Sequence, residues 1–309
     1  MVRTVTIVVL GVLFFTNLSF SHAATSDSDT LQNATVNLYC KVKLGGRTYS
    51  TTGSGVFIDE RGVILTNAHV AQYFLLSEGS RRAKGNCSVR TGSPAKDQYT
   101  ASLLYISPTW IAGYADAVSD KTQTKGTGER DFALLYVTGT KNKKSALPTE
   151  FPALPLASLS LVSGLSEGTE IAITGYPAEG KDYKEVQKKL AQLTATTTIT
   201  SIRYFERPYA DVLVLGPTLA GRGGVSGGPI TNTSDEVLGI VTTMGSDKGK
   251  LRSLRAISLV HVDRVLRADT GLSFPSLLLG NFATRRSFTL AALPSDVYTI
   301  IETVIRRIK

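Results

Sequence analysis

The sequence predicts an all-β fold built from antiparallel β-barrels, and three observations support this prediction. Many short apolar runs are rich in β-branched residues, they recur at irregular spacing, and glycine-containing turns separate them. Strands alternating with helices would instead predict a parallel sheet. With 42% hydrophobic residues, a chain of 309 residues can bury one large core or two moderate ones.

The N-terminal residues precede the first predicted strand. Arg3 is followed by an apolar run at 7–15, and Ser21-His22-Ala23 provides small residues at the offsets of a cleavage site. This pattern predicts a secretory signal over 1–23, cleaved after Ala23, and therefore a periplasmic or secreted protein. The apolar run is short for a membrane span, and an uncleaved anchor is the alternative. Residues 24–33 are rich in Ser, Thr and Asp and predict a disordered lead-in.

The expected strands follow from about Ala34. They cover residues 36–39, 53–58, 62–65, 102–106, 132–137, 170–174, 196–202, 212–215 and 237–242. Two segments depart from this pattern. The long polar, glycine-rich stretch 77–130 indicates an inserted or elaborated loop region, and 181–193 has the composition of a surface helix.

The end of the chain shows helical periodicity. Residues 258–266 predict a helix, and we place the boundary of the main domain, 34–268, just after it. The tail, 269–309, ends in an amphipathic stretch whose apolar face carries Val297, Ile300, Ile301, Val304 and Ile308. We expect this face to pack on the main domain, and contact with a partner or a membrane is the alternative.

The two cysteines, Cys40 and Cys87, flank the segment that contains His69. In an oxidising compartment we expect a disulfide between them, worth about 3–4 kcal/mol, and two buried free thiols are the alternative. Two cysteines and three histidines show no metal-ligand spacing, so we expect neither a metal nor another cofactor.

The chain carries a formal net charge of +9, which becomes +8 once Arg3 leaves with the signal. Its basic residues are scattered, with small clusters near 81–84, 141–144 and 306–309 and no aromatic residues interleaved to stack bases. We therefore expect no nucleic-acid partner. The surface charge is suited to weak contact with anionic envelope surfaces.

The chemistry is indicated most strongly by residues 223–229, GGVSGGP, which place Ser226 in a turn of small residues before the apolar run 237–241. Glycines let backbone amides point at a substrate oxygen. A serine nucleophile needs a base, and His69 in LTNAHVA supplies one, while Asp131 begins an apolar run and can orient that base. A structural histidine and an ordinary glycine turn are the alternatives. Asp116 and Asp120 compete with Asp131, but they stand in polar sequence.

Taken in order, the segments at 53–58, 62–70, 131–135, 175–177 and 224–229 resemble the trypsin-like serine peptidases, in particular the bacterial HtrA (Deg) type. The resemblance covers roughly residues 53–266. It implies two six-stranded antiparallel barrels packed together with the active site in the cleft between them, to which the sequence patterns add a C-terminal helix and inserted loops. It also implies that His69, Asp131 and Ser226 form the catalytic triad, with the amides of Gly224 and Ser226 as the oxyanion hole.

The sequence departs from this family in two places. Val225 stands where digestive enzymes carry aspartate and the HtrA type carries asparagine, so an ion pair to a newly freed N-terminus cannot form there. Either other contacts hold the turn open or the enzyme needs a trigger. We also expect no PDZ domain, and therefore neither the substrate tethering nor the cage assembly typical of HtrA proteins.

Substrate preference is indicated only weakly. Ala220, six residues before Ser226, falls at the base of the family's primary pocket, and Thr242 is the second candidate pocket residue. Without an acid there we expect a small or apolar residue before the scissile bond, although the nearby Arg222 could favour an acidic one. We thus predict an exported endopeptidase acting on proteins or peptides. A catalytically inactive relative that binds peptides is the alternative, and binding of nucleic acid or another polymer through the basic surface is a third hypothesis.

Overall fold

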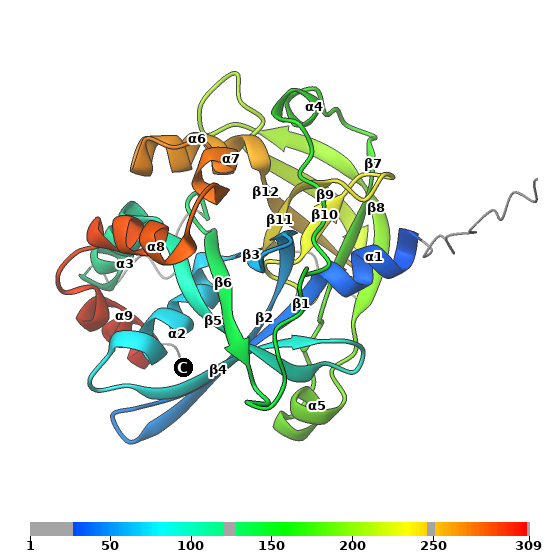
Figure 1. Ribbon diagram of the computed structural model, residues 1–309. Helices are drawn as coiled ribbons and strands as arrows, with labels where there is room; N and C mark the ends of the chain where they lie inside the picture. Colours follow the sequence, from blue (N-terminus) through cyan, green and yellow to red (C-terminus); the bar gives the residue numbers. More distant parts are fainter. Residues whose placement is uncertain (1–26, 120–127, 246–250, 308–309) are drawn as a thin grey trace, which may run out of the picture.

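Two closed β-barrels, each of six antiparallel strands, form the centre of the computed structural model, which describes residues 27–119, 128–245 and 251–307 (Figure 1). The neighbour order is β1-β2-β3-β6-β5-β4 in the first barrel and β10-β11-β12-β9-β8-β7 in the second. The first barrel comprises β1 (Thr35–Leu44), β2 (Arg47–Asp59), β3 (Val63–Thr66), β4 (Lys84–Thr91), β5 (Lys96–Ile106) and β6 (Ala133–Thr140). The second comprises β7 (Glu170–Gly175), β8 (Leu193–Arg203), β9 (Val212–Thr218), β10 (Pro229–Thr231), β11 (Val237–Met244) and β12 (Arg252–Ser258). The predicted fold class is confirmed.

Local sequence explains how the first barrel starts. Strands β1 and β2 form a hairpin in which Leu44 pairs with Arg47. Between them, Gly45 and Gly46 have φ values of 58° and 82°, as a two-residue turn of the primed type requires. The buried residues Val56, Phe57, Ile64 and Leu65 then make the β2–β3 pair part of the hydrophobic core.

The prediction of an inserted loop over 77–130 is wrong for much of that range. Strands β4 and β5 lie within it as members of the first barrel, and α3 (Pro108–Ser119) follows them. The first three residues of each strand are exposed, and only their later residues are buried. Polar, solvent-facing strand ends therefore gave this region the composition of a loop.

The disordered lead-in predicted for 24–33 is also wrong where the structure describes it. Residues Asp27–Ala34 form helix α1, and the buried Leu31 and Ala34 join the hydrophobic core, which fixes the helix on the barrels. The predicted signal at 1–23 lies outside the described residues. The helix predicted over 181–193 is shorter, because α5 (Tyr183–Lys188) begins at a capping box of Asp182 and Glu185 and β8 already starts at Leu193.

Four helices close the chain: α6 (Leu259–Thr270), α7 (Phe274–Leu278), α8 (Phe282–Ala291) and α9 (Val297–Arg307). The boundary predicted after residue 268 thus falls inside α6. Helix α9 packs on the first barrel, as expected, with Val297, Ile301 and Ile305 in that barrel's core cluster. Ile300 is half-buried, and Ile308 lies outside the described residues. None of the helices in the described ranges has the length and apolarity needed to cross a membrane.

Candidate active site

The two barrels contribute different parts of the candidate site. His69 stands in the first turn of α2 (Ala68–Gly79), just after β3, and Asp131 stands two residues before β6 begins at Ala133. Strands β3 and β6 are neighbours with Thr66 opposite Ala133. The residues that leave β3 and enter β6 therefore lie at the same end of the barrel. Ser226 comes from the second barrel, in the turn between β9 and β10.

His69 and Asp131 form a hydrogen-bonded pair. Nδ1 of His69 lies 2.8 Å from Oδ2 of Asp131, and the backbone N–H of His69 donates to Oδ1 at 2.9 Å. Asn67 caps no amide of α2 with its side chain; instead it donates to the backbone carbonyl of Asp131 at 2.7 Å. Asp131 is buried, whereas the His69 side chain remains 35% exposed. The carboxylate therefore holds the Nδ1 edge of the imidazole, while another part of the ring is exposed to solvent.

The electrostatic environment favours the charged forms of both groups. Burial alone lowers the pKa of His69, but the charge and hydrogen bond of Asp131 raise it by more, so the net pKa is above the ordinary histidine value. Burial raises the pKa of Asp131, but His69 and a hydrogen bond from Thr242 lower it by more, so the net pKa is below the ordinary aspartate value. Asp131 therefore stays ionised beside the imidazole.

Thr242 occupies a place that sequence reasoning missed. Its Oγ1 on β11 donates to Oδ2 of Asp131 at 3.1 Å, and the residue is buried. The sequence assigned Thr242 to a specificity pocket, but the hydroxyl is engaged with the carboxylate. No local signal could have shown this contact, because it joins residues 111 positions apart.

The turn that carries Ser226 lies against the first barrel. The backbone N–H of Ser54 on β2 donates to the carbonyl of Ser226 at 2.8 Å. Next to it, Gly227 has φ 83°, and a Cβ at this position would lie 2.2 Å from the Ser54 carbonyl oxygen and 3.1 Å from the Asn67 nitrogen. Only glycine permits this approach. The Ser226 turn is thereby brought against the segment that precedes His69.

Gly224 is the second glycine that the turn requires. Its φ is 102°, and a Cβ there would lie 2.5 Å from the carbonyl oxygen of Tyr176. The Ser54 hydroxyl donates to the Gly224 carbonyl at 2.8 Å and so fixes this peptide unit. Within the part of the chain that the structure describes, neither the Gly224 amide nor the Ser226 amide donates a hydrogen bond to a protein group.

Other contacts support the turn in place of the ion pair that Val225 cannot make. The Val225 side chain is buried in the core cluster that includes the second barrel, and its carbonyl accepts from Gly228 at 2.8 Å. The Gly223 amide donates to Oε2 of Glu179 at 3.0 Å, and Arg252 pairs with the same carboxylate. Sequence reasoning missed Glu179 and Arg252, which are 73 positions apart.

The remaining sequence candidates fall outside this cluster or are not described. Ala220 is completely buried and belongs to the core cluster that includes the second barrel, so its place in a specificity pocket stays a prediction. Asp120 lies outside the described residues, and the side chain of Asp116 is not described. Among the side chains that the structure does describe, none are grouped as three or more potential metal ligands.

The predicted disulfide is present. Cys40 on β1 and Cys87 on β4 are directly opposite each other in the strand register and are joined by their sulfur atoms. The bond links two neighbouring strands of the first barrel on either side of the chain segment that carries His69.

Comparisons with known proteins identify a matching family and similar solved structures. A family model described as "Trypsin-like peptidase domain" matches residues 53–240. Among solved structures, the chain is similar to an inactive mutant of Rv3671c from M. tuberculosis H37Rv, with 17% identity over 79% of this chain and 90% of that one and a TM-score of 0.46. It is also similar to the HtrA-type protease AlgW with a decapeptide, with 17% identity over 79% of this chain and 67% of that one and a TM-score of 0.48. A search of curated proteins gave no match.

Proposed function

The chain belongs to the trypsin-like peptidase domain family, and on this basis we propose that it is an exported serine endopeptidase. Its substrates are proteins or peptides, and it cleaves them through an acyl-enzyme intermediate. The observation that carries the proposal is the His69–Asp131 pair at 2.8 Å, with the Ser226 turn hydrogen-bonded to the same barrel through Ser54. A serine in such a turn, a histidine and a buried carboxylate are the three groups that this chemistry needs.

The first chemical step is a proton transfer. With Nδ1–H donating to Asp131, the Nε2 atom of His69 is left as the acceptor for the Ser226 hydroxyl proton. The Ser226 oxygen then attacks the scissile carbonyl carbon and forms a tetrahedral intermediate. His69 returns the proton to the leaving amine as the C–N bond breaks, and water hydrolyses the acyl-enzyme by the same steps in reverse order.

The amides of Gly224 and Ser226 are assigned to the oxyanion. The Gly223 carbonyl, which shares a peptide unit with the Gly224 N–H, accepts from the amides of Ala178 and Glu179 at 2.7 and 3.1 Å, so this N–H needs little reorganisation in the transition state. The loss of one such donor costs about 3–4 kcal/mol of transition-state stabilisation. The glycine at 224 is therefore as necessary to the proposal as the serine hydroxyl.

Export is supported by the signal-like sequence at 1–23 and by the Cys40–Cys87 disulfide, which suits an oxidising compartment. The test is N-terminal sequencing of protein from the fraction outside the cytoplasm. We expect a chain that begins at Ala24. A chain found only in the cytoplasm with an intact N-terminus would contradict export.

The peptidase proposal is tested with a phosphonate probe that forms a covalent bond with activated serines. We expect labelling of the wild type, none in Ser226→Ala and a sharp fall in His69→Ala. The exposed Ser163 on helix α4 (Leu159–Ser163) supplies a matched control, because Ser163→Ala should label like the wild type. A folded, oxidised wild type that never labels would favour the alternative of an inactive peptide-binding module.

A further inference from the structure

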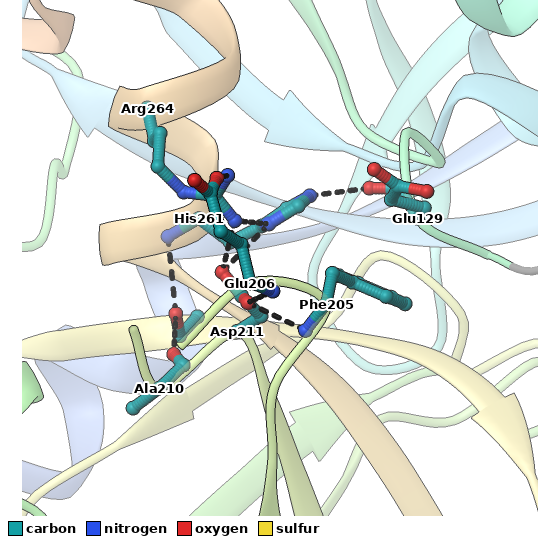
Figure 2. A network of polar contacts seen from close by, with 8 residues as sticks. Glu129, Phe205, Glu206, Ala210, Asp211, His261 and Arg264 are labelled. Atoms are coloured by element: carbon teal, nitrogen blue, oxygen red, sulfur yellow. Dashed lines mark hydrogen bonds and ion pairs between the residues drawn. The ribbon is translucent and has the colours of Figure 1, made fainter. Parts of the chain in front are cut away.

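A second, fully buried His–Asp pair lies apart from the candidate triad (Figure 2). His261 stands in the first turn of α6, where the side chain of the N-cap residue Ser258 accepts from its backbone N–H at 3.2 Å. Its Nδ1 lies 3.0 Å from Oδ1 of Asp211, which precedes β9. Neither side chain is exposed. A buried polar network is costly unless every member is hydrogen-bonded, so its partners deserve a full account.

Asp211 is the fixed end of this pair. Its Oδ2 accepts from the backbone amides of Phe205 and Glu206 at 2.7 and 3.1 Å, and Arg264 adds an ion pair to Oδ1. The Phe205 ring also lies against the His261 ring, with centroids 5.1 Å apart. The carboxylate and the aromatic contact together set the direction of the imidazole.

The other ring nitrogen of His261, Nε2, contacts the segment that leads into strand β6 of the first barrel. Nε2 lies 2.5 Å from the backbone carbonyl of Glu129, as Figure 2 shows. A carbonyl oxygen only accepts, so Nε2 must carry the proton. This assignment holds whether Nδ1 is protonated toward Asp211 or accepts from Arg264, whose Nη2 lies 3.3 Å away. The link to Glu129 is therefore kept in both protonation states.

Glu129 stands two residues before Asp131, in a short non-strand segment that leads into β6. Helix α6 holds this segment at a second point, because Asp269 pairs with Arg130 at 3.0 Å and also accepts from the Tyr105 hydroxyl at 2.7 Å. Asp131 itself accepts from His69 and Thr242. Two contacts thus link α6 to the segment just before the carboxylate, from His261 to Glu129 and from Asp269 to Arg130.

We propose that His261 is a positioning residue for catalysis: its Nε2–H fixes the Glu129 carbonyl and thereby the placement of Asp131 against His69. This inference rests on the proposed function for its effect on rate, but the placement itself is independent of activity. His261 touches neither His69 nor Ser226 in any described contact. Its contribution is transmitted through one backbone carbonyl.

The test compares two substitutions at His261. In His261→Gln, the amide nitrogen stands the same number of bonds from Cα as Nε2 and keeps the donor. In His261→Met, the volume is similar but the donor is lost. We expect His261→Met to lower kcat on a peptide substrate by roughly 10- to 100-fold with little change in KM, and His261→Gln to restore most of the loss.

Two further measurements separate positioning from general destabilisation. Asp263→Asn alters another buried acid of α6, one that accepts from Phe274 and Arg267, and should leave kcat unchanged. In an Asp131→Asn background, His261→Met should cost no more than about a further twofold, because the two changes act on one group. Full additivity of the two losses would overturn the inference.

A readout without activity distinguishes this inference from the proposed function. The chain has three histidines, and His22 lies in the predicted signal, so in His261→Met the NMR titration reports His69 alone. We expect the pKa of His69 to fall relative to wild type, because the Asp131 carboxylate is no longer held in place to stabilise the charged imidazole. Should His261→Met not fold, Asp211→Asn, which weakens the anchor of the ring, should lower this pKa in the same direction.

The outcomes separate clearly. An inactive wild type in which the His69 pKa still falls on substitution would defeat the peptidase proposal and support the positioning role. An active wild type whose kcat and His69 pKa are the same in His261→Met and Asp211→Asn would overturn the positioning role and leave the peptidase proposal intact.

Discussion

Asp131 accepts hydrogen bonds from the backbone and ring of His69 and from the hydroxyl of Thr242. These three donors account for a carboxylate that stays ionised although it is buried. They also occupy both oxygens, so the carboxylate has one orientation. At this scale the site is a buried anion whose direction is fixed by donors from α2 and β11.

The raised pKa of His69 should set the pH dependence of the proposed peptidase activity. Only neutral His69 can take the Ser226 proton, so kcat/KM should fall as pH decreases through a pKa above the usual value of about 6.5. In Asp131→Asn the acid limb should move to lower pH, because the charge that raises this pKa is gone, and kcat should fall by about 10⁴-fold. Steady-state pH profiles of both proteins check this; an unshifted limb in Asp131→Asn would contradict the assignment.

The same pair has a predictable effect on stability. Its contribution to the free energy of unfolding is complete between the ordinary pKa values of aspartate and histidine, about 3.9 and about 6.5. The contribution declines as pH falls from the lower value through the lowered pKa of Asp131, and as pH rises from the upper value through the raised pKa of His69.

The residues of the candidate triad could be proposed from sequence because each stands in a short motif with its own pattern. Thr242, Glu179 and His261 could not. Each acts through a contact between segments far apart in the chain. Such a contact produces no motif or regular residue spacing in the sequence. The sequence showed His261 only as a helix residue, since its partner on the site side is a backbone carbonyl.

At the scale of elements, the predicted strands include those with continuous apolar runs, such as β3 and β11, which are mostly or wholly buried. β4 was missed, and only the part of β5 over 102–106 was predicted, because the first three residues of each strand are exposed and polar. β10 spans three residues, too few to show a period. Exposed first residues thus hid β4 and the start of β5, and short length hid β10.

The Cys40–Cys87 bond should stabilise the β1–β4 pair and the barrel with it. We expect Cys40→Ala/Cys87→Ala to lower the free energy of unfolding by about 3–4 kcal/mol, measured by chemical denaturation. Reductant should lower the stability of the wild type to a similar level and leave the double variant unchanged. About two free thiols in the unreduced, denatured wild type would show that the bond does not form in the protein.

At the scale of the whole molecule, the C-terminal helices pack on both β-barrels. Helix α6 packs with the second barrel, while α8 and α9 return to the first. Ser80, just after α2, donates to Glu302 on α9, and Arg286 on α8 pairs with Glu78 of α2. The helix that carries His69 is therefore braced by the tail.

Substitution in α9 should measure this brace. Ile305 is fully buried in the core of the first barrel, so Ile305→Ala should lower the free energy of unfolding by about 2–5 kcal/mol. Thr299, exposed on the same helix, supplies the control, and Thr299→Ala should change it by no more than about 0.5 kcal/mol. Equal effects of the two changes in a denaturation experiment would show that α9 is not part of the cooperative unit.

The packing of α9 on the first barrel also affects the order in which the chain can fold during synthesis. All six strands of the first barrel have been synthesised by Thr140, yet that barrel's core includes side chains from Val297, Ile301 and Ile305. Nascent domains fold as they leave the ribosome, N-terminal portions first. Here the first barrel cannot finish packing until α9 has been synthesised, so a chain that still lacks α9 keeps an uncovered apolar face on that barrel.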